Sequence, residues 1–512
     1  MAVLDRNHRI HRHRRRHLSP RARSGDHHVH TDGHPRRRAG TGHGGRRKHS
    51  SGRRGMASRA RHKGKAEGSK RMNRDLHVLV IGGGIGGLCL AQGLKKSGVS
   101  VTVCERDTSA AARLQGFRIH IDPQGSQALH DCLPEHRWNL FTATCGDYGR
   151  GFTLLSEKLD ELMQYREPHE TADPVRRHRS VSRSTLRQVL LAGLGDTVRF
   201  NRRFVRYERG PEGRITAFFE DGSTEQADVM VAADGVNSRV REQYLPGNEP
   251  VDTGSISLGG KIPLTDGVMA LLPPCLLDGP AIVLPPSPAN LFMAAWRRSA
   301  HAKEMARQLR DASPASRAVT DDEGDYVVMA LGARREYFRL NCEPEEMTPA
   351  QMLDLMRSKV SAWHPNLRKL VEMMNHDLGF LNIRTSRPVA PWTPTNITLL
   401  GDAIHSMTPY RGVGANIALR DAGQLCAALA AAARGERPLT EAIGEYEAQM
   451  RVYGFHAVSE SLKSLEQAIS EKKFGFRVAM SAMRMANHVP ALRRKMVASL
   501  EARPPKSVAQ AS

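Results

Sequence analysis

The chain has 512 residues and a formal net charge of +23. Residues 1–71 hold 22 Lys and Arg against 4 Asp and Glu, so that segment carries +18 of the total. The strong basicity therefore belongs to a tail, and we expect no nucleic-acid binding by the part that follows. That part is long enough for two or three structural units.

Residues 1–71 contain almost no Leu, Ile, Val or Phe, so they bury too little apolar surface to offset the entropy of ordering. We expect a disordered tail. Its arginine clusters are typical of nucleic-acid or anionic-membrane binding, and an Arg-rich, acid-poor segment also fits a transit peptide. Translated GC-rich upstream DNA has the same composition, and we favour a start at or near Met72.

The seven cysteines are scattered and form no CxxC pair, which predicts neither a disulfide framework nor a zinc site. No uninterrupted apolar run approaches the ~18 residues that a membrane helix needs, because prolines and Asp278 interrupt the best candidate, residues 268–296. We expect a soluble cytoplasmic protein without a bound metal.

The first structured segment is a short apolar run at 76–81, the pattern of a buried parallel strand. It leads into Gly82-x-Gly84-x-x-Gly87 and an apolar helical stretch. In such a loop the first glycine permits a tight turn, the second lets the backbone approach a pyrophosphate, and the third lets helix and strand pack closely. The helix N-terminus offers unpaired N–H groups to phosphates.

A second predicted strand, 99–104, ends in Glu105, where an acidic side chain would meet a ribose hydroxyl. Strand, glycine loop, helix and acid together predict a dinucleotide site. An acid at this place favours an unphosphorylated ribose, as in FAD or NAD.

Residues 198–232 have the pattern of strands and turns, with Asp221-Gly222 as a hairpin turn. The last strand is followed by Asp234-Gly235, and Asn237 and Ser238 shortly after can cap a short helix.

A further apolar strand at 397–400 stops at Gly401-Asp402. A carboxylate at a strand's C-terminal end points into the ligand crevice of an open α/β sheet. Gly412 and Gly414 would let the backbone lie against a flat ring, and a helix starting near Asn416 would place positive potential beside it.

The three segments resemble the fingerprints of the single-component FAD-dependent aromatic hydroxylases, the group A flavoprotein monooxygenases typified by para-hydroxybenzoate hydroxylase. The resemblance covers residues 76 to about 430. It implies a Rossmann-like α/β FAD-binding domain with an inserted, mostly antiparallel substrate sheet and a helical C-terminus. Tyr410-Arg411 departs from the usual proline-and-glycine pair of the third motif.

The resemblance also implies roles for individual residues. The cofactor-binding positions that it implies are Gly82, Gly84, Gly87, Glu105, Gly116, Arg118, Arg183, Asp234, Gly235, Asp402, Gly412, Gly414, Ala415 and Asn416. Candidates for a catalytic role are Arg183, Arg241, His405 and Pro409. Arg183 and Arg241 are also candidate partners for nicotinamide phosphates, and a structural histidine is an equal alternative for His405.

The implied reaction uses NADH or NADPH to reduce FAD, and the flavin reacts with O2 to a hydroperoxide that hydroxylates or epoxidises a small, aromatic or polyketide-like substrate. The chain has one complete dinucleotide motif, and the resemblance implies that the nicotinamide cofactor binds transiently in a groove, as in that family. A flavin-dependent reductase or dehydrogenase on the same fold is an alternative, and nucleic-acid binding through residues 1–71 is another.

Period-two runs separated by Pro- and Gly-rich turns predict the substrate sheet at 251–384, with helices within 352–374. The cofactor domain would comprise 72–250 and 385–435, and helices would follow at 436–512. Candidate pocket residues on the sheet are Lys261, Met293, Trp296 and Met329, although a Met or Trp in such a run is more often core. The Met-rich, basic last helix fits packing on the cofactor domain or contact with a membrane or subunit.

Overall fold

The computed structural model describes residues 76–110, 117–146, 148–149, 151–166, 173–312, 324–374 and 378–470. The predictions made for residues 1–71, for Gly116 and for the helix expected in 471–512 fall outside these described residues.

A five-stranded parallel sheet forms the base of the cofactor half, in the order β17-β11-β1-β2-β7. Most of its strands are short, largely apolar runs buried on both faces, as expected for a parallel sheet between helices. They are β1 (His77–Ile81), β2 (Ser100–Cys104), β7 (Val198–Arg199), β11 (Val229–Ala232) and β17 (Ile397–Leu399).

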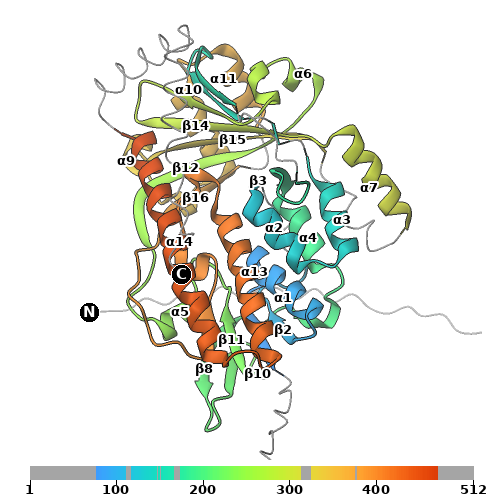
Figure 1. Ribbon diagram of the computed structural model, residues 1–512. Helices are drawn as coiled ribbons and strands as arrows, with labels where there is room; N and C mark the ends of the chain where they lie inside the picture. Colours follow the sequence, from blue (N-terminus) through green and yellow to red (C-terminus); the bar gives the residue numbers. More distant parts are fainter. Residues whose placement is uncertain are drawn as a thin grey trace, which may run out of the picture. The chain divides into compact units, whose positions relative to one another are not determined.

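Helices pack against this sheet and against one another (Figure 1). Helix α13 (Gly414–Ala433) contacts α1, α2 and α14, so the segment after the third motif lies against the helix of the first. The other helices of this half are α1 (Ile85–Lys96), α2 (Pro123–Cys132), α3 (Glu135–Thr144), α4 (Arg183–Leu191), α5 (Arg239–Tyr244), α12 (Asp402–His405) and α14 (Leu439–Ala468).

Two small antiparallel sheets accompany it. One joins β8 (Phe204–Arg209), β9 (Ile215–Phe219) and β10 (Thr224–Ala227), and its turn lies at Asp221-Gly222 as predicted, with Gly222 at a φ of 80°. The other pairs β3 (Arg118–Ile121) with β6 (Arg179–Ser182).

The predicted second sheet has seven strands in the order β16-β12-β15-β14-β13-β4-β5. All neighbouring pairs are antiparallel except β13 with β4, so the prediction of a mostly antiparallel sheet is confirmed. Its strands are β4 (Gly151–Ser156), β5 (Glu161–Arg166), β12 (Val251–Pro263), β13 (Ala281–Leu284), β14 (Ala289–Trp296), β15 (Tyr326–Arg334) and β16 (Gly379–Thr385).

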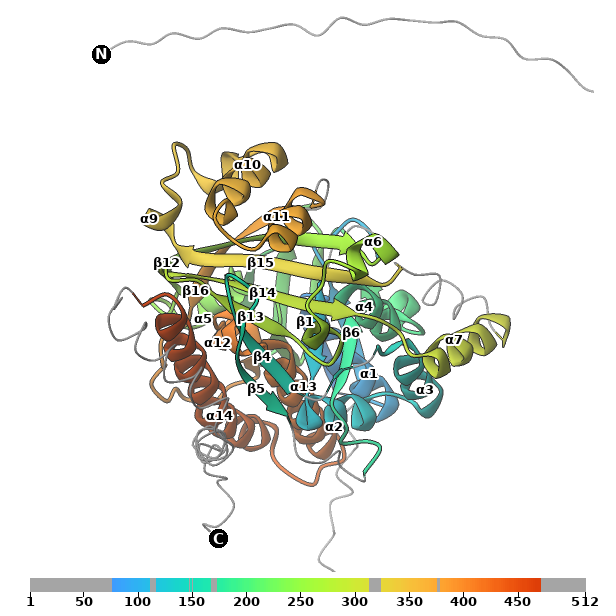
Figure 2. The same cartoon turned by 90° about the horizontal axis from the view of Figure 1, so that it is seen from above.

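The position of β4 and β5 corrects the sequence analysis, which placed residues 151–166 in the cofactor domain. In the structure they extend the large sheet beyond β13 (Figure 2). The two strands lie far from β13 in sequence, and their pairing depends on tertiary contacts that the local pattern does not encode. The remaining domain boundaries stay predictions.

Helices cover one face of the large sheet, which we call the outer face (Figure 1), and buried residues there form a second hydrophobic cluster. The helices that contribute to this cluster are α6 (Asp266–Met269), α9 (Arg335–Phe338), α10 (Pro349–Val360) and α11 (Pro365–Glu372), and the last two correspond to the helices predicted within 352–374. Helix α7 (Ala300–Ala312) precedes β15 in sequence.

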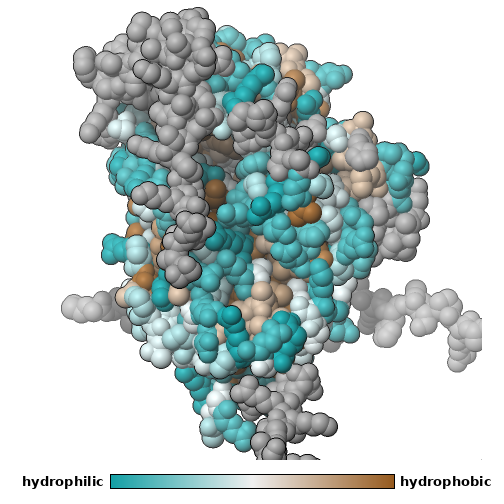
Figure 3. Space-filling model, in the orientation of Figure 1, coloured by the Kyte–Doolittle hydropathy of each residue, from teal (hydrophilic) through white to brown (hydrophobic). Residues whose placement is uncertain are grey.

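Among the described residues, no helix is both long and apolar enough to cross a membrane. On the face shown in Figure 3, hydrophobic residues surface as small separate patches among hydrophilic ones. The same part of the chain contains no group of three or more His, Cys, Asp or Glu side chains arranged to hold a metal ion.

Candidate active site

The three sequence motifs meet at one edge of the parallel sheet because the strands before them end in register. Ile81 of β1 pairs with Ala232 of β11, and Ala232 pairs with Leu399 of β17. On the other side of β1, Ile81 pairs with Cys104 of β2. The residues that follow these four strand ends are therefore neighbours at the carboxyl edge, where open α/β sheets bind ligands.

Backbone contacts between the motifs are too close for side chains. A Cβ on Gly82, whose φ is 110°, would lie 2.3 Å from the Ala233 carbonyl oxygen. A Cβ on Gly87 would lie 2.2 Å from the Gly82 carbonyl oxygen and 3.1 Å from the Ala233 Cβ. The turn at Gly82 and the helix–strand packing at Gly87 thus account for two of the three glycines.

Gly84 is different, because no atom lies within 4 Å of the place where its Cβ would be. It is exposed and precedes α1, whose N-terminus has no side-chain cap. The first N–H groups of α1 therefore have no side-chain partner and are available to an anionic group beside Gly84.

Glu105 supports the glycine loop. Its Oε2 accepts a hydrogen bond of 2.6 Å from the Gly83 N–H, and Oε1 accepts one of 2.9 Å from the Asp107 N–H. A carboxylate can accept about four hydrogen bonds, so capacity for a ribose hydroxyl remains.

Sequence reasoning missed Arg187. It is buried, and its Nε donates to the Gly83 carbonyl at 3.2 Å while Nη1 donates to the Ala110 carbonyl at 2.8 Å. It follows Arg183 by four residues in α4, so both lie on one helix face. The four-residue spacing of Arg183 and Arg187 was the sequence feature from which a contact between α4 and the glycine loop could have been predicted.

Asp234 presents an unused acceptor at the same edge. Its Oδ2 accepts hydrogen bonds from the Arg239 and Val240 N–H groups at 2.9 and 3.4 Å, whereas Oδ1 is buried without a partner. Burial raises the pKa of Asp234 and the hydrogen bonds oppose that rise. Buried polar atoms are rarely left unpaired, so Oδ1 fits a contact with a bound group.

Asp402 lies close enough to Arg183 for their charges to interact. Asp402 is exposed, yet protein surrounds its carboxyl closely enough that burial raises its pKa, with His405 and Arg183 opposing the rise. Arg183 is exposed at the start of α4.

Helix α13 begins at Gly414, two residues before the predicted start at Asn416, and Gly412 precedes it at a φ of 63°. Gly414 and Ala415 occupy its first turn and are partly exposed, and the helix lacks a side-chain cap. Its N-terminal N–H groups and positive dipole end are therefore free to act on a ligand. Pro409, in the 3-10 turn η4 (Pro409–Arg411), is exposed.

The Asn416 side chain is hydrogen-bonded within the protein. Its Oδ1 accepts from the Asp122 N–H at 3.0 Å, and its Nδ2 donates to the His120 carbonyl at 2.9 Å. It is buried and fastens α13 to the segment after β3.

Arg241 and His405 make buried contacts within the protein. Arg241 is 3% exposed and donates to the Ala403 and Val236 carbonyls at 2.9 and 3.0 Å, so its guanidinium joins the second motif to the third. His405 is fully buried, and its Nε2 lies 2.7 Å from Asp421 Oδ2. Burial lowers the pKa of His405, but Asp421 outweighs it and the net pKa is raised.

Of the four pocket candidates on the sheet, two face the wrong way. Met293 and Met329 are register partners that belong to the hydrophobic cluster on the outer face. Trp296 points to the opposite face but is fully buried, stacked on Tyr326 at 5.3 Å between ring centroids. Lys261 is partly exposed, with its Nζ 4.7 Å from the centroid of the Tyr326 ring.

The other face of the sheet, which we call the inner face, is directed toward the third motif. The Tyr410 hydroxyl, from the loop before α13, accepts a hydrogen bond of 3.0 Å from Asn290 Nδ2 of β14. A Cβ on Gly332, the register partner of Asn290 in β15, would lie 2.4 Å from that hydroxyl.

A row of apolar side chains crosses this inner face. Phe292 lies two residues after Asn290 and so on the same face of β14. Its row, by strand pairing, comprises Leu154, Ile282, Phe292 and Ala330. All four are partly exposed while their sequence neighbours toward the outer face are buried. Sequence reasoning missed this row, because the period-two pattern does not tell which face the helices cover.

Arg118 extends from β3, and its Nε donates to Ser180 Oγ at 2.9 Å.

Comparison with known proteins agrees with this geometry. Residues 80–157 match a model of the NAD(P)-binding Rossmann-like domain, and residues 380–461 match a model of an FAD binding domain. A solved structure of a Photorhabdus luminescens protein assigned as an FAD-containing monooxygenase is 38% identical, with a TM-score of 0.67. The match covers 77% of this chain and 98% of that protein. The chain belongs to the family of FAD-dependent monooxygenases.

Curated relatives of this monooxygenase family include the dual O-methyltransferase/FAD-dependent monooxygenase elcB of Phaeosphaeria nodorum, 30% identical over 78% of this chain and 45% of its own length. Thus the chain spans about half the length of that relative. The 6-hydroxynicotinate 3-monooxygenase of Bordetella bronchiseptica is 26% identical over 68% of this chain and 81% of its own length. The resemblance drawn from the motifs and the Rossmann-like FAD-binding fold are confirmed.

Proposed function

We propose that the protein is an oxidoreductase that uses NADH or NADPH and O2 to hydroxylate or epoxidise a small organic substrate, with FAD as its cofactor. The observation that carries this proposal is the register of Ile81, Ala232 and Leu399, which brings three separated motifs to one sheet edge.

The residues at that edge fit FAD. The open space at Gly84 and the uncapped N-terminus of α1 suit a pyrophosphate, and Glu105 suits a ribose. The unpaired Oδ1 of Asp234 and the accessible carboxylate of Asp402 supply acceptors for hydroxyl groups. When bound, FAD supplies the redox chemistry by which O2 is activated.

The protein's own contribution to the chemistry is electrostatic. The N-terminus of α13 lies after Gly412 and carries unpaired N–H groups, so it stabilises negative charge that develops on a ring placed against it. His405 and Arg241 hold the third motif in place through buried hydrogen bonds rather than by exchanging protons with a substrate.

The substrate would lie between this loop and the inner face of the large sheet. The apolar row that includes Phe292 and Ile282 favours a flat, largely apolar molecule, which is what an aromatic ring presents. A relative that acts on 6-hydroxynicotinate supports an aromatic substrate.

The test begins with the purified protein, whose bound flavin is measured by its visible absorbance. Phenolic and polyketide-like compounds are then screened for those that stimulate NAD(P)H oxidation. A monooxygenase consumes one O2 for each hydroxylated product formed. Substrate reduction or oxidation without O2 uptake would instead identify a reductase or dehydrogenase. A folded preparation that stays colourless after reconstitution with FAD would refute the proposal.

A further inference from the structure

Three cysteine thiols meet where helices α1, α2 and α13 pack together. Cys89 lies in α1, Cys132 is the last residue of α2, and Cys426 lies in α13. All three are buried, and none of them forms a disulfide in the structure. A Cβ on Gly93 would lie 2.6 Å from Cys426 Sγ and 2.9 Å from Cys132 Sγ, so these two sulfur atoms border the same point. We call the three cysteines the thiol cluster.

The thiol cluster is the second of two places at which α2 and α13 are joined. At the first, Asn416 Oδ1 in α13 accepts a hydrogen bond of 3.0 Å from the N–H of Asp122, the residue that caps α2. Cys132 and Cys426 each lie ten residues further along the chain, which is about 15 Å of helix. The two helices therefore run in the same direction and pack along that length.

A positive charge lies beside the cluster. The Cys132 and Cys426 thiols are joined by a hydrogen bond, and this contact and burial raise the pKa of Cys426, while polar neighbours that include Lys96 oppose the rise. Lys96 Nζ donates to the Asp131 and Leu133 carbonyls at 2.7 and 2.9 Å, on either side of Cys132. Because the thiolate is the nucleophilic form of cysteine, the Lys96 ammonium favours reaction at Cys426.

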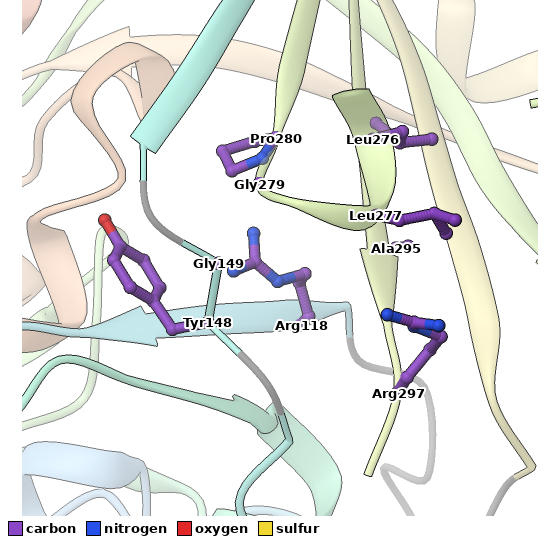
Figure 4. Close-up of a pocket in the computed structure, with 9 residues that line it drawn as sticks. All are labelled: Arg118, Tyr148, Gly149, Leu276, Leu277, Gly279, Pro280, Ala295 and Arg297. Carbon is purple, nitrogen blue, oxygen red and sulfur yellow. The ribbon is translucent and has the colours of Figure 1, made fainter. Parts of the chain in front are cut away.

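Small molecules can approach the cluster from the end of α2. Cys426 is 7% exposed and is the most accessible residue of the three. A surface depression of about 440 Å³ lies beside it in the fold, and Lys96 and Leu133 are among the residues that line this depression. By contrast, the recess that Arg118 lines in Figure 4 has a volume of about 10 Å³, room for one water molecule. The depression at α2 easily admits a molecule of the size of hydrogen peroxide.

We propose that Cys132 and Cys426 are a redox modification site, at which a peroxide converts the two thiols to a disulfide that joins α2 to α13. Burial slows the first attack on the peroxide, because it disfavours the thiolate. The second step is faster, because Cys132 is already in contact with Cys426. The new bond would hold α13, whose N-terminus faces the proposed flavin ring, against α2 at a second point.

The oxidation balances with one molecule of hydrogen peroxide. The Cys426 thiol loses its proton and its sulfur attacks one peroxide oxygen. The O–O bond breaks, the sulfenic acid of Cys426 forms, and the departing hydroxide takes up the proton as water. The Cys132 sulfur then displaces the hydroxyl group from Cys426, and the Cys132 proton leaves with that group as a second water. The two thiols lose two electrons, which reduce the peroxide.

The experiment treats the FAD-loaded protein with hydrogen peroxide, blocks the remaining thiols with N-ethylmaleimide under denaturing conditions, and maps disulfides by mass spectrometry of an unreduced digest. We expect peptides joined through Cys132 and Cys426, which dithiothreitol separates. We also expect the midpoint of thermal unfolding to rise by about 5 °C, because the cross-link closes a long loop and so restricts the unfolded chain. Cys426→Ser should abolish both effects.

Cys342→Ser is the matched control, because it removes an exposed thiol outside the thiol cluster and should leave both effects intact. Recovery of Cys132 and Cys426 as blocked thiols, after peroxide has oxidised Cys342 in the wild-type chain, would overturn the inference. So would a cross-link of Cys132 to Cys89, or a cross-linked protein that unfolds at a lower temperature. The peptides are identified in the wild-type chain, so the result does not depend on whether Cys426→Ser folds. The modification needs no substrate, so this inference and the proposed function fail separately.

Discussion

The Asn290 amide donates a hydrogen bond of 3.0 Å to the Tyr410 hydroxyl, and this contact joins the large sheet to the loop that precedes α13. The same loop is held on its other side, where Thr408 Oγ1 donates to the Ser461 carbonyl of α14 at 2.7 Å. Tyr410 is among the residues that depart from the family pattern, so the chain fixes the position of this loop by contacts of its own.

Gly332→Ala should destabilise the protein because the added Cβ would lie 2.4 Å from the Tyr410 hydroxyl. Tyr410→Phe removes that hydroxyl, at a cost of about 1 kcal/mol for the lost hydrogen bond. In the Tyr410→Phe background, Gly332→Ala should therefore cost less than it does alone. Urea unfolding of the two single variants and the double variant measures this coupling, and additive effects would show that the contact does not form.

Gly84→Val should weaken FAD binding by tens-fold or more without lowering the thermal stability of the apoprotein, because the side chain would occupy open space where the pyrophosphate is expected. Gly379→Val is the matched control, since Gly379 also has open space around its Cβ position and a strand conformation that valine adopts readily. Titration with FAD, followed by flavin fluorescence, distinguishes them. Equal FAD affinities for the two variants would contradict the proposed cofactor site.

Asp421→Asn should release FAD and destabilise the fold by roughly 3 kcal/mol. The buried Asp421 carboxylate accepts hydrogen bonds from the Gly401 N–H at 2.7 Å, from His405 Nε2 at 2.7 Å and from the Tyr453 hydroxyl at 2.6 Å. The asparagine amide would place its own N–H group against one of the three groups that donate hydrogen bonds to Asp421. The ratio of flavin to protein absorbance and urea unfolding check this, with the exposed Asp131→Asn as control; unchanged flavin content would mean that the third motif does not depend on Asp421.

Glu447 should make the stability of the protein fall with rising pH. Its carboxyl is fully buried, beside Thr398 and Trp392, without a hydrogen bond of normal geometry. Burial raises the pKa of Glu447 to about 7 from 4.5, with Thr398, Trp392 and Arg451 opposing the rise. The folded state then holds the proton more tightly than the unfolded state.

Stability should therefore decrease as pH rises from about 4.5 to about 7 and level off above that, with a total loss of roughly 3 kcal/mol. Glu447→Gln should remove this component and stabilise the protein at pH 8. Urea unfolding between pH 5 and pH 8 measures it, with the exposed Glu466→Gln as control. A wild-type pH profile that coincides with that of Glu447→Gln would contradict the prediction.

The glycine loop, the strands that precede the three motifs and the antiparallel character of the large sheet were all predictable from sequence. Each depends on local features: Gly82 needs a positive φ in the turn after β1, and apolar runs such as 229–232 are buried on both faces. The hairpin turn at Gly222 follows from the same local constraint.

The roles of Asn416, Arg241 and Met293 were not predictable in this way. Each depends on what packs opposite the residue. Asn416 donates a hydrogen bond to the β3 segment, Arg241 donates one to the Ala403 carbonyl, and Met293 packs in the hydrophobic cluster on the outer face. Motif matching gave Asn416 and Arg241 the family's roles by position, and Met293 was a pocket candidate from its place in the predicted sheet, but the side-chain partners of all three are contributed by distant parts of the chain.

The sequence by itself determined which segments turn, pair and approach a ligand, because glycine conformation and apolar periodicity act within a few residues. Only the tertiary structure decided that Phe292 faces the cofactor half while Met293 faces α10 and α11, and that β4 and β5 extend the large sheet. Because side chains alternate along a strand, neighbouring residues point to opposite faces of the sheet. Which side meets helices and which meets the site depends on contacts between elements far apart in sequence.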